Sequence, residues 1–152
     1  MLCFKRKLLI FKEKGVVVPT FMKQEVLNRL KDYFRAQPKV AMAFLFGSRS
    51  RGRNGPESDY DFGVYFQPGY TCQDIYQIWN ELEDMLKKQV DLLVLNETTP
   101  LLAWTAIKGR RLFVRDANFY LQYMLSISRE AEDFQQFLLD WWSWRMKVRG
   151  EV

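Results

Sequence analysis

A Gly-Ser pair followed by two closely spaced aspartates is the feature of this 152-residue chain whose residue types could do chemistry. Ten residues separate Gly47-Ser48 from Asp59, and Asp61 lies two positions further on. Glycine lets the backbone approach a ligand closely, and the neighbouring hydroxyl can donate to a phosphate oxygen. Carboxylates are the oxygen ligands that Mg²⁺ prefers. The motif therefore predicts a site for phosphate and a divalent metal.

Two predicted strands position this motif. The apolar run 40–46 is typical of a buried strand and ends at Gly47, where the chain must turn. Residues 60–66 are β-branched and aromatic enough to form a second strand. Because side chains alternate across a strand, Asp59 and Asp61 are expected on the same face, where they could share metal ions.

The turn between these strands is rich in arginine. Ser48 is expected to cap a short helical turn through Arg49 and Arg51. The free N–H groups and positive dipole end of such a turn favour a phosphate, and both arginines are candidates to neutralise the leaving group. The alternative is that the arginines face solvent, which is the usual place for surface charge.

A third carboxylate interrupts a later strand-like run. Asp91 lies within residues 89–95, which are otherwise mostly apolar. A lone acid in a strand is costly if it is buried without a partner, so a metal ion or a reacting hydroxyl would explain it. The alternative is a strand end in solvent. The pair at Asp59 and Asp61 favours the first interpretation, in which Asp91 binds a second metal or accepts a proton.

These segments resemble the signature of the DNA polymerase β type nucleotidyltransferase superfamily, and the short chain resembles its minimal nucleotidyltransferase branch. The resemblance covers about residues 21–116 and rests on segments 46–52, 58–64 and 107–113. It implies an α+β (mixed α/β) fold, with a mixed sheet flanked by helices and a C-terminal helical segment. It also implies ATP as substrate, with two Mg²⁺ ions held by Asp59, Asp61 and Asp91, and phosphates held by Gly47, Ser48, Arg49 and Arg51.

The resemblance also implies a partner. Members of this branch are commonly antitoxins encoded beside a HEPN-domain ribonuclease toxin, and some transfer AMP from ATP onto a toxin tyrosine. The expected function is therefore AMP transfer to a hydroxyl of a cognate HEPN toxin, which neutralises the toxin within a hetero-oligomer. Two alternatives stay open: an antitoxin that acts mainly by binding, and a nucleotidyltransferase for a small molecule such as an aminoglycoside-like amino sugar.

Composition excludes several other classes of enzyme. The chain contains no histidine, so Ser-His-Asp catalysis, Cys-His catalysis and histidine-based zinc sites are excluded. Two cysteines give no metal-ligand spacing and no disulfide framework, which favours a cytoplasmic protein. No apolar stretch is long enough for a membrane span. The net charge of +5 would attract a polyanion, but no nucleic-acid-binding motif is present, so nucleic acid is not required.

The chain is expected to form one domain with two additions. We expect an N-terminal extension over residues 1–20, containing a strand near 15–19, then a core over 21–116 and a helical segment over 117–152 that breaks once. Met22 is an alternative start. Helices are predicted at 21–34, 71–88 and 98–107, and a last strand at 111–114. Aromatic residues between 134 and 144 lie at helical spacing, and they either cover the core or bind a partner.

Overall fold

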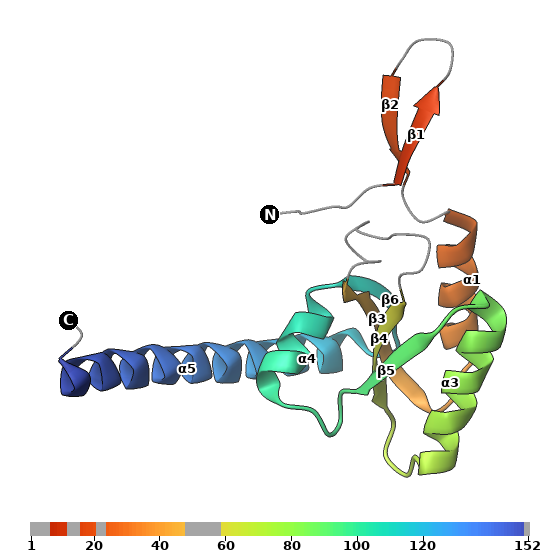
Figure 1. The fold of residues 1–152 in the computed structure, drawn as a ribbon. Coiled ribbons are helices and arrows are strands. Elements are labelled where there is room, and N and C mark those ends of the chain that lie inside the picture. Colours follow the sequence, from red (N-terminus) through yellow and green to blue (C-terminus); the bar gives the residue numbers. More distant parts are fainter. Residues whose placement is uncertain (1–6, 12–15, 21–23, 48–58, 151–152) are drawn as a thin grey trace.

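The computed structural model describes residues 7–11, 16–20, 24–47 and 59–150, and its centre is a four-stranded mixed sheet. The strands lie in the order β5-β4-β3-β6 (Figure 1). Strand β3 (Val40–Phe46) pairs antiparallel with both β4 (Tyr60–Phe66) and β6 (Arg110–Val114), whereas β5 (Val90–Val94) is parallel to β4. Helix α3 (Cys72–Leu86) supplies the crossover that parallel strands need.

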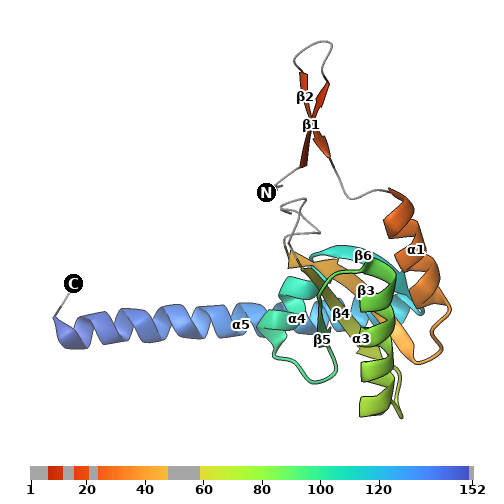
Figure 2. The same cartoon turned by 45° about the vertical axis from the view of Figure 1, so that its right-hand side comes forward.

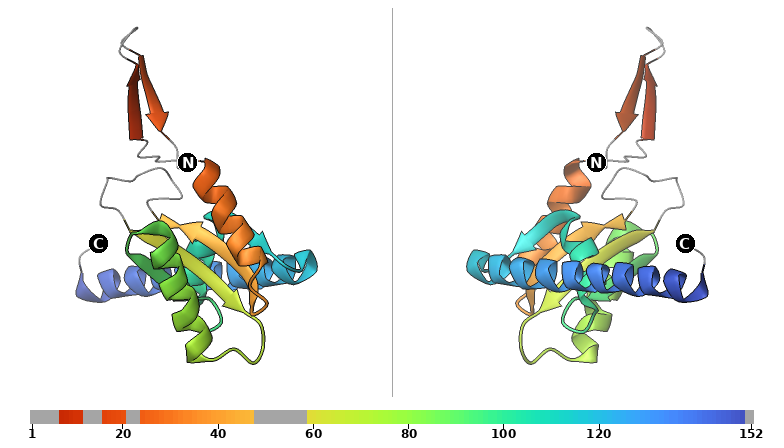
Figure 3. Two further views of the ribbon diagram at one scale, coloured as in Figure 1. Left: turned by 90° about the vertical axis from the view of Figure 1, so that its right-hand side faces the viewer. Right: turned by 90° about the vertical axis from the view of Figure 1, so that its left-hand side faces the viewer.

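Helices cover both faces of this sheet (Figure 3). Helix α1 (Gln24–Arg35) and α3 bury Leu30, Phe34 and Leu82 against one face. On the opposite face, α4 (Pro100–Ile107) and the first half of α5 (Ala117–Arg149) pack against a cluster that includes Met42 and Phe44. The α+β fold expected from the sequence is confirmed.

A polar contact ties the two helices of the first face together. Tyr33 of α1 donates its hydroxyl to Glu81 of α3 at 2.6 Å. Burial raises the pKa of the Tyr33 hydroxyl, and the hydrogen bond to the carboxylate raises it further. Glu83 accepts a hydrogen bond from the backbone of Val90 at 3.3 Å. Both glutamates of α3 therefore accept hydrogen bonds from other elements.

The N-terminal and C-terminal elements differ from the prediction in detail. Strands β1 (Lys7–Phe11) and β2 (Val16–Thr20) form a separate antiparallel pair, of which the sequence predicted only the second strand. Helix α5 runs through 33 residues without the predicted break, because no glycine or proline interrupts residues 117–149. Asp116 caps its start and Gly150, with a φ of 69°, caps its end.

Candidate active site

The sheet order brings two of the predicted carboxylates side by side. In the parallel pair of β4 and β5, Asp61 lies opposite Asp91. On the other side of β4, Asp61 lies opposite Phe46, the last residue of β3. Gly47 follows Phe46 directly, so Gly47 and both aspartates lie at one end of the sheet. Asp59 immediately precedes β4 at the same end.

Strand alternation sets the face on which these carboxylates lie. Tyr60 and Phe62 are buried in the cluster beneath α1 and α3. Asp61 therefore points to the opposite face, which α4 covers. Val90 and Leu92 contact the first cluster in the same way, so Asp91 shares the α4 face with Asp61. Asp61 is half-buried, and Asp59 and Asp91 are exposed, so the site opens to solvent around a partly enclosed carboxylate.

Glycine is required at position 47 for two reasons. Its φ is +70°, a conformation that other residues adopt only at a cost. A Cβ built there would also collide with Oδ2 of Asp61 and would lie 2.9 Å from its Cγ. The backbone of the turn thus lies directly against the Asp61 carboxylate, an arrangement that leaves no space for a side chain between them.

A second glycine supports the same corner. Gly109 follows α4, which is capped by Lys108 in an ordinary right-handed conformation. A Cβ on Gly109 would overlap the carbonyl oxygen of Leu45 and lie 2.8 Å from Cβ of Phe46. Gly109 therefore allows the connection from α4 to β6 to pack against the end of β3.

The carboxylates repel one another in the absence of a cation. The pKa of Asp61 is raised from its ordinary 3.8, first by burial and then by the negative charges of Asp91 and Asp59. Within residues 24–47 and 59–150, no ion pair offsets these three acids. A bound cation would relieve this repulsion and lower the pKa of Asp61 again.

The donor chemistry fits Mg²⁺ when the substrate supplies part of the coordination. Among the described residues, no group of three acidic, histidine or cysteine side chains is already arranged to hold a metal ion. Mg²⁺ is commonly bound by one or two carboxylates together with phosphate oxygens and water. The half-buried Asp61, with Asp59 just before β4 and Asp91 opposite it on β5, provides such a partial set. Ser48, Arg49 and Arg51, predicted to bind phosphate, lie outside the described residues.

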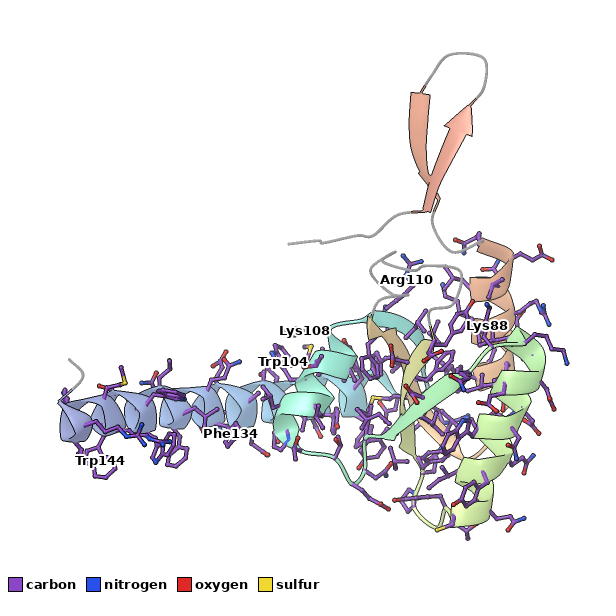
Figure 4. All side chains as sticks on the ribbon, in the orientation of Figure 1. Lys88, Trp104, Lys108, Arg110, Phe134 and Trp144 are labelled. Atoms are coloured by element: carbon purple, nitrogen blue, oxygen red, sulfur yellow. The ribbon has the colours of Figure 1, made fainter. Side chains whose placement is uncertain are left out.

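Three basic residues of the stretch 108–115 lie in different places. Lys108 lies over the Trp104 ring, with its Nζ 5.4 Å from the centroid, and Arg110 lies opposite Leu45 near the end of β3 (Figure 4). Arg115 is at the other end of the sheet, where it donates to the backbone carbonyls of Gln37 at 2.8 Å and Val40 at 3.1 Å. Arg110 is therefore at the same end of the sheet as the aspartates, and Arg115 is not.

Comparison with known proteins agrees with this arrangement. Residues 28–118, which include both strands that carry Asp61 and Asp91, match the family described as polymerase beta, nucleotidyltransferase. The chain belongs to this nucleotidyltransferase family. A Methanocaldococcus jannaschii protein named as a candidate protein adenylyltransferase is 40% identical over 63 residues, which are 41% of this chain and 68% of that protein. Membership of the family makes the chain a nucleotidyltransferase, as the sequence predicted.

Several solved structures have the same fold. A toxin-antitoxin structure with AMP-PNP aligns with a TM-score of 0.62 and 20% identity, covering 78% of this chain and 97% of that one. A complex of a tri-AMPylated Shewanella oneidensis HEPN toxin with its MNT antitoxin gives 0.61, 20% and the same coverage. A candidate minimal nucleotidyltransferase gives a TM-score of 0.51 and 26% identity, covering 59% of this chain and 94% of that one.

Proposed function

We propose that this nucleotidyltransferase transfers AMP from ATP to a hydroxyl group of a cognate HEPN ribonuclease toxin, with tyrosine as the expected acceptor, and so neutralises the toxin. The observation that carries the proposal is the register that places Asp61 beside Asp91, with the Gly47 backbone against the Asp61 carboxylate. Support for a toxin as acceptor comes from a structural neighbour described as an AMPylated HEPN toxin with its antitoxin.

The proposed roles of Gly47, Asp59 and Asp61 draw on their positions at one end of the sheet, and those of Ser48, Arg49 and Arg51 draw on the sequence motif alone. Asp59 and Asp61 would hold Mg²⁺, which, when bound, neutralises phosphate oxygens during transfer. The Gly47 backbone and Ser48 would seat the β and γ phosphates, and Arg49 and Arg51 would offset the charge of the departing pyrophosphate. With these roles, the α phosphorus would lie near the exposed Asp91.

Asp91 is the proposed proton acceptor. Its exposure at the mouth of the site leaves a carboxylate oxygen accessible to an incoming hydroxyl group. As the hydroxyl oxygen forms its bond to the α phosphorus, its proton passes to this carboxylate, and the bond between the α phosphorus and pyrophosphate breaks. The products are an AMP ester of the acceptor and pyrophosphate. The chain itself forms no covalent intermediate in this route.

The decisive experiment combines the purified chain with the HEPN protein encoded beside it, ATP and Mg²⁺, and measures the intact mass of both proteins. We expect the toxin to gain one or more AMP increments. Asp59→Asn together with Asp61→Asn should abolish the increment. Asp84→Asn is a matched control, because Asp84 is an exposed acid on α3, which packs on the sheet face opposite to that of Asp61 and Asp91, and it should transfer AMP normally.

The outcomes separate the proposal from its alternatives. Full AMP transfer by the double variant would remove the aspartates from the mechanism. Neutralisation of the toxin by the double variant, without any mass increment, would favour an antitoxin that acts by binding. An unmodified toxin combined with AMP transfer to an amino sugar would favour the small-molecule enzyme.

A further inference from the structure

The second half of α5 extends beyond the body of the molecule (Figure 2). It exposes many large apolar side chains. We call residues 132–149 the projecting segment. Ala131, just before it, is the last residue of α5 that is buried. The exposed apolar residues of the projecting segment include Phe134, Phe137, Leu138, Leu139, Trp141, Trp142, Trp144 and Val148. A surface of this size on a single helix indicates an interface.

These side chains follow a seven-residue pattern. Phe134, Trp141 and Val148 are seven residues apart, and Phe137 and Trp144 lie three positions after the first two. Apolar residues at this spacing form the seam of a coiled coil. Counting back by seven from Phe134 leads to Ile127 and Tyr120, which pack against the sheet on the α4 face. The seam therefore continues the face of α5 that packs against the core. Beyond Ala131 this face is exposed.

Most charges along this part of α5 are separated by sign. Six residues follow the separation, with Glu130, Glu132 and Asp133 around the start of the projecting segment and Arg145, Lys147 and Arg149 at its end. Arg129 precedes the acids, and Asp140 lies between the two groups. Within the described part of the chain, no ion pair uses any of these six residues. A partner helix with the reverse order of charges would complement both ends at once. An identical helix that runs in the opposite direction has this order.

We infer that the projecting segment pairs antiparallel with the same segment of a second copy of this chain. The apolar seam supplies the stability, since surface ion pairs contribute little, and the charges select the antiparallel direction. In a parallel pair, acidic residues would face acidic residues and basic residues would face basic ones. An antiparallel pair has a twofold axis, so both copies use the same surface and the assembly closes as a dimer. This interface leaves both catalytic sheet ends free.

Sedimentation of the purified full-length chain tests the seam. We expect the mass of a dimer at micromolar concentration. Phe137→Asp, which places a charge on the seam, should weaken the dimer by about tenfold or more. Ser143→Asp is the matched control, because Ser143 is exposed on the opposite side of the same helix, and its dimer should dissociate at the wild-type concentration. Circular dichroism establishes that each variant keeps its helix content.

Charge reversal tests the direction. One variant carries Glu130→Lys, Glu132→Lys and Asp133→Lys, and the other carries Arg145→Glu, Lys147→Glu and Arg149→Glu. Each variant alone should dimerise more weakly than the wild type, and an equal mixture of the two should recover the dimer. In a parallel pair, the first variant would replace repulsion between acidic residues with repulsion between lysines. Its dimer would then be as tight as the wild-type dimer.

Three results would overturn the inference. The first is a wild-type chain that sediments as a monomer at all concentrations. The second is a first charge variant that dimerises as tightly as the wild type. The third is a projecting segment that becomes protected from proteolysis only when a HEPN toxin is added, which would assign the seam to the toxin. AMP transfer is measured separately, so its absence would not affect any of these results.

Discussion

At the residue scale, the site depends on how closely the Gly47 backbone approaches Asp61. The sequence located both residues from their types and spacing, and it placed Asp91 as a third candidate. It could not establish that Asp61 and Asp91 are neighbours, because that register joins strands separated by a whole helix. It also could not show that no side chain fits at position 109, because that requirement depends on where the end of β3 lies.

Replacement of Gly47 by alanine is expected to remove activity as well as some stability. The positive φ alone should cost about 1 kcal/mol of unfolding free energy, and the added Cβ displaces the Asp61 carboxylate. Gly69→Ala isolates the first effect, because Gly69 has a φ of +86° with nothing within 4 Å of its Cβ position. Urea unfolding and AMP-transfer rates measure both. Equal activity in the two variants would show that the contact with Asp61 is unimportant.

Mg²⁺ should stabilise the chain through Asp61. A cation offsets the mutual repulsion of the carboxylates, and a ligand that binds only the folded state raises the melting temperature. We expect Mg²⁺ to raise the melting temperature of the wild type and of Asp84→Asn, but much less that of Asp61→Asn. Thermal unfolding with and without Mg²⁺ measures this difference. An equal rise in all three proteins would place the metal elsewhere.

At the element scale, local sequence signals predicted most of the strands and helices, but they missed one strand. The strand that ends just before Gly47 and the strand that carries Asp61 formed as predicted, because each is a short, mostly apolar run bounded by turn residues. Strand β1 was missed because its basic and apolar residues lack a strand-like alternation. The start of α3 shows a complete local signal: Thr71 and Asp74 form a capping box, in which each side chain accepts a hydrogen bond from the other's backbone.

This capping box should make stability depend on pH in acid. The backbone N–H of Thr71 lowers the pKa of Asp74 below its ordinary 3.8, its side-chain hydroxyl and the charge of Lys39 act in the same direction, and burial opposes them. The ionised carboxylate therefore stabilises the folded state above pH 3.8, and this contribution is lost as the pH falls through the lowered pKa.

The corresponding comparison is between the wild type and Asp74→Asn. The wild type should be more stable at neutral pH, and the difference in unfolding free energy should shrink below pH 3.8. Denaturant unfolding over this range measures it. A difference that is independent of pH would show that the carboxylate charge makes no contribution at this helix start.

At the scale of the whole molecule, α5 has two parts with different surroundings. Its first half contributes Phe119, Tyr123 and Ile127 to the cluster on the α4 face. None of the residues of the projecting segment is buried. The predicted division between a core over 21–116 and a helical segment over 117–152 remains untested. The packing of α5 places the last core contact near Ala131.

Shortened chains test this division. A chain that ends at residue 133 keeps every buried residue of α5 and should unfold at nearly the wild-type temperature. A chain that ends at residue 116 loses the aromatic contacts with Phe44 and Tyr65, and it should fail to fold cooperatively. Calorimetry measures both transitions. A cooperative transition in the shorter chain would place the boundary after Asp116.

The central position of β3 also bears on how the protein is made. Strand β3 has β4 on one side and β6 on the other, and nearly all of its side chains are buried. During synthesis, β4 emerges soon after β3 and can pair with it, but β6 emerges only after α3, β5 and α4. For that interval the nascent chain presents an unpaired apolar strand edge, which other strands can join. The aspartates therefore emerge from the ribosome before β6, the strand that covers the open edge of β3 and protects the sheet from aggregation.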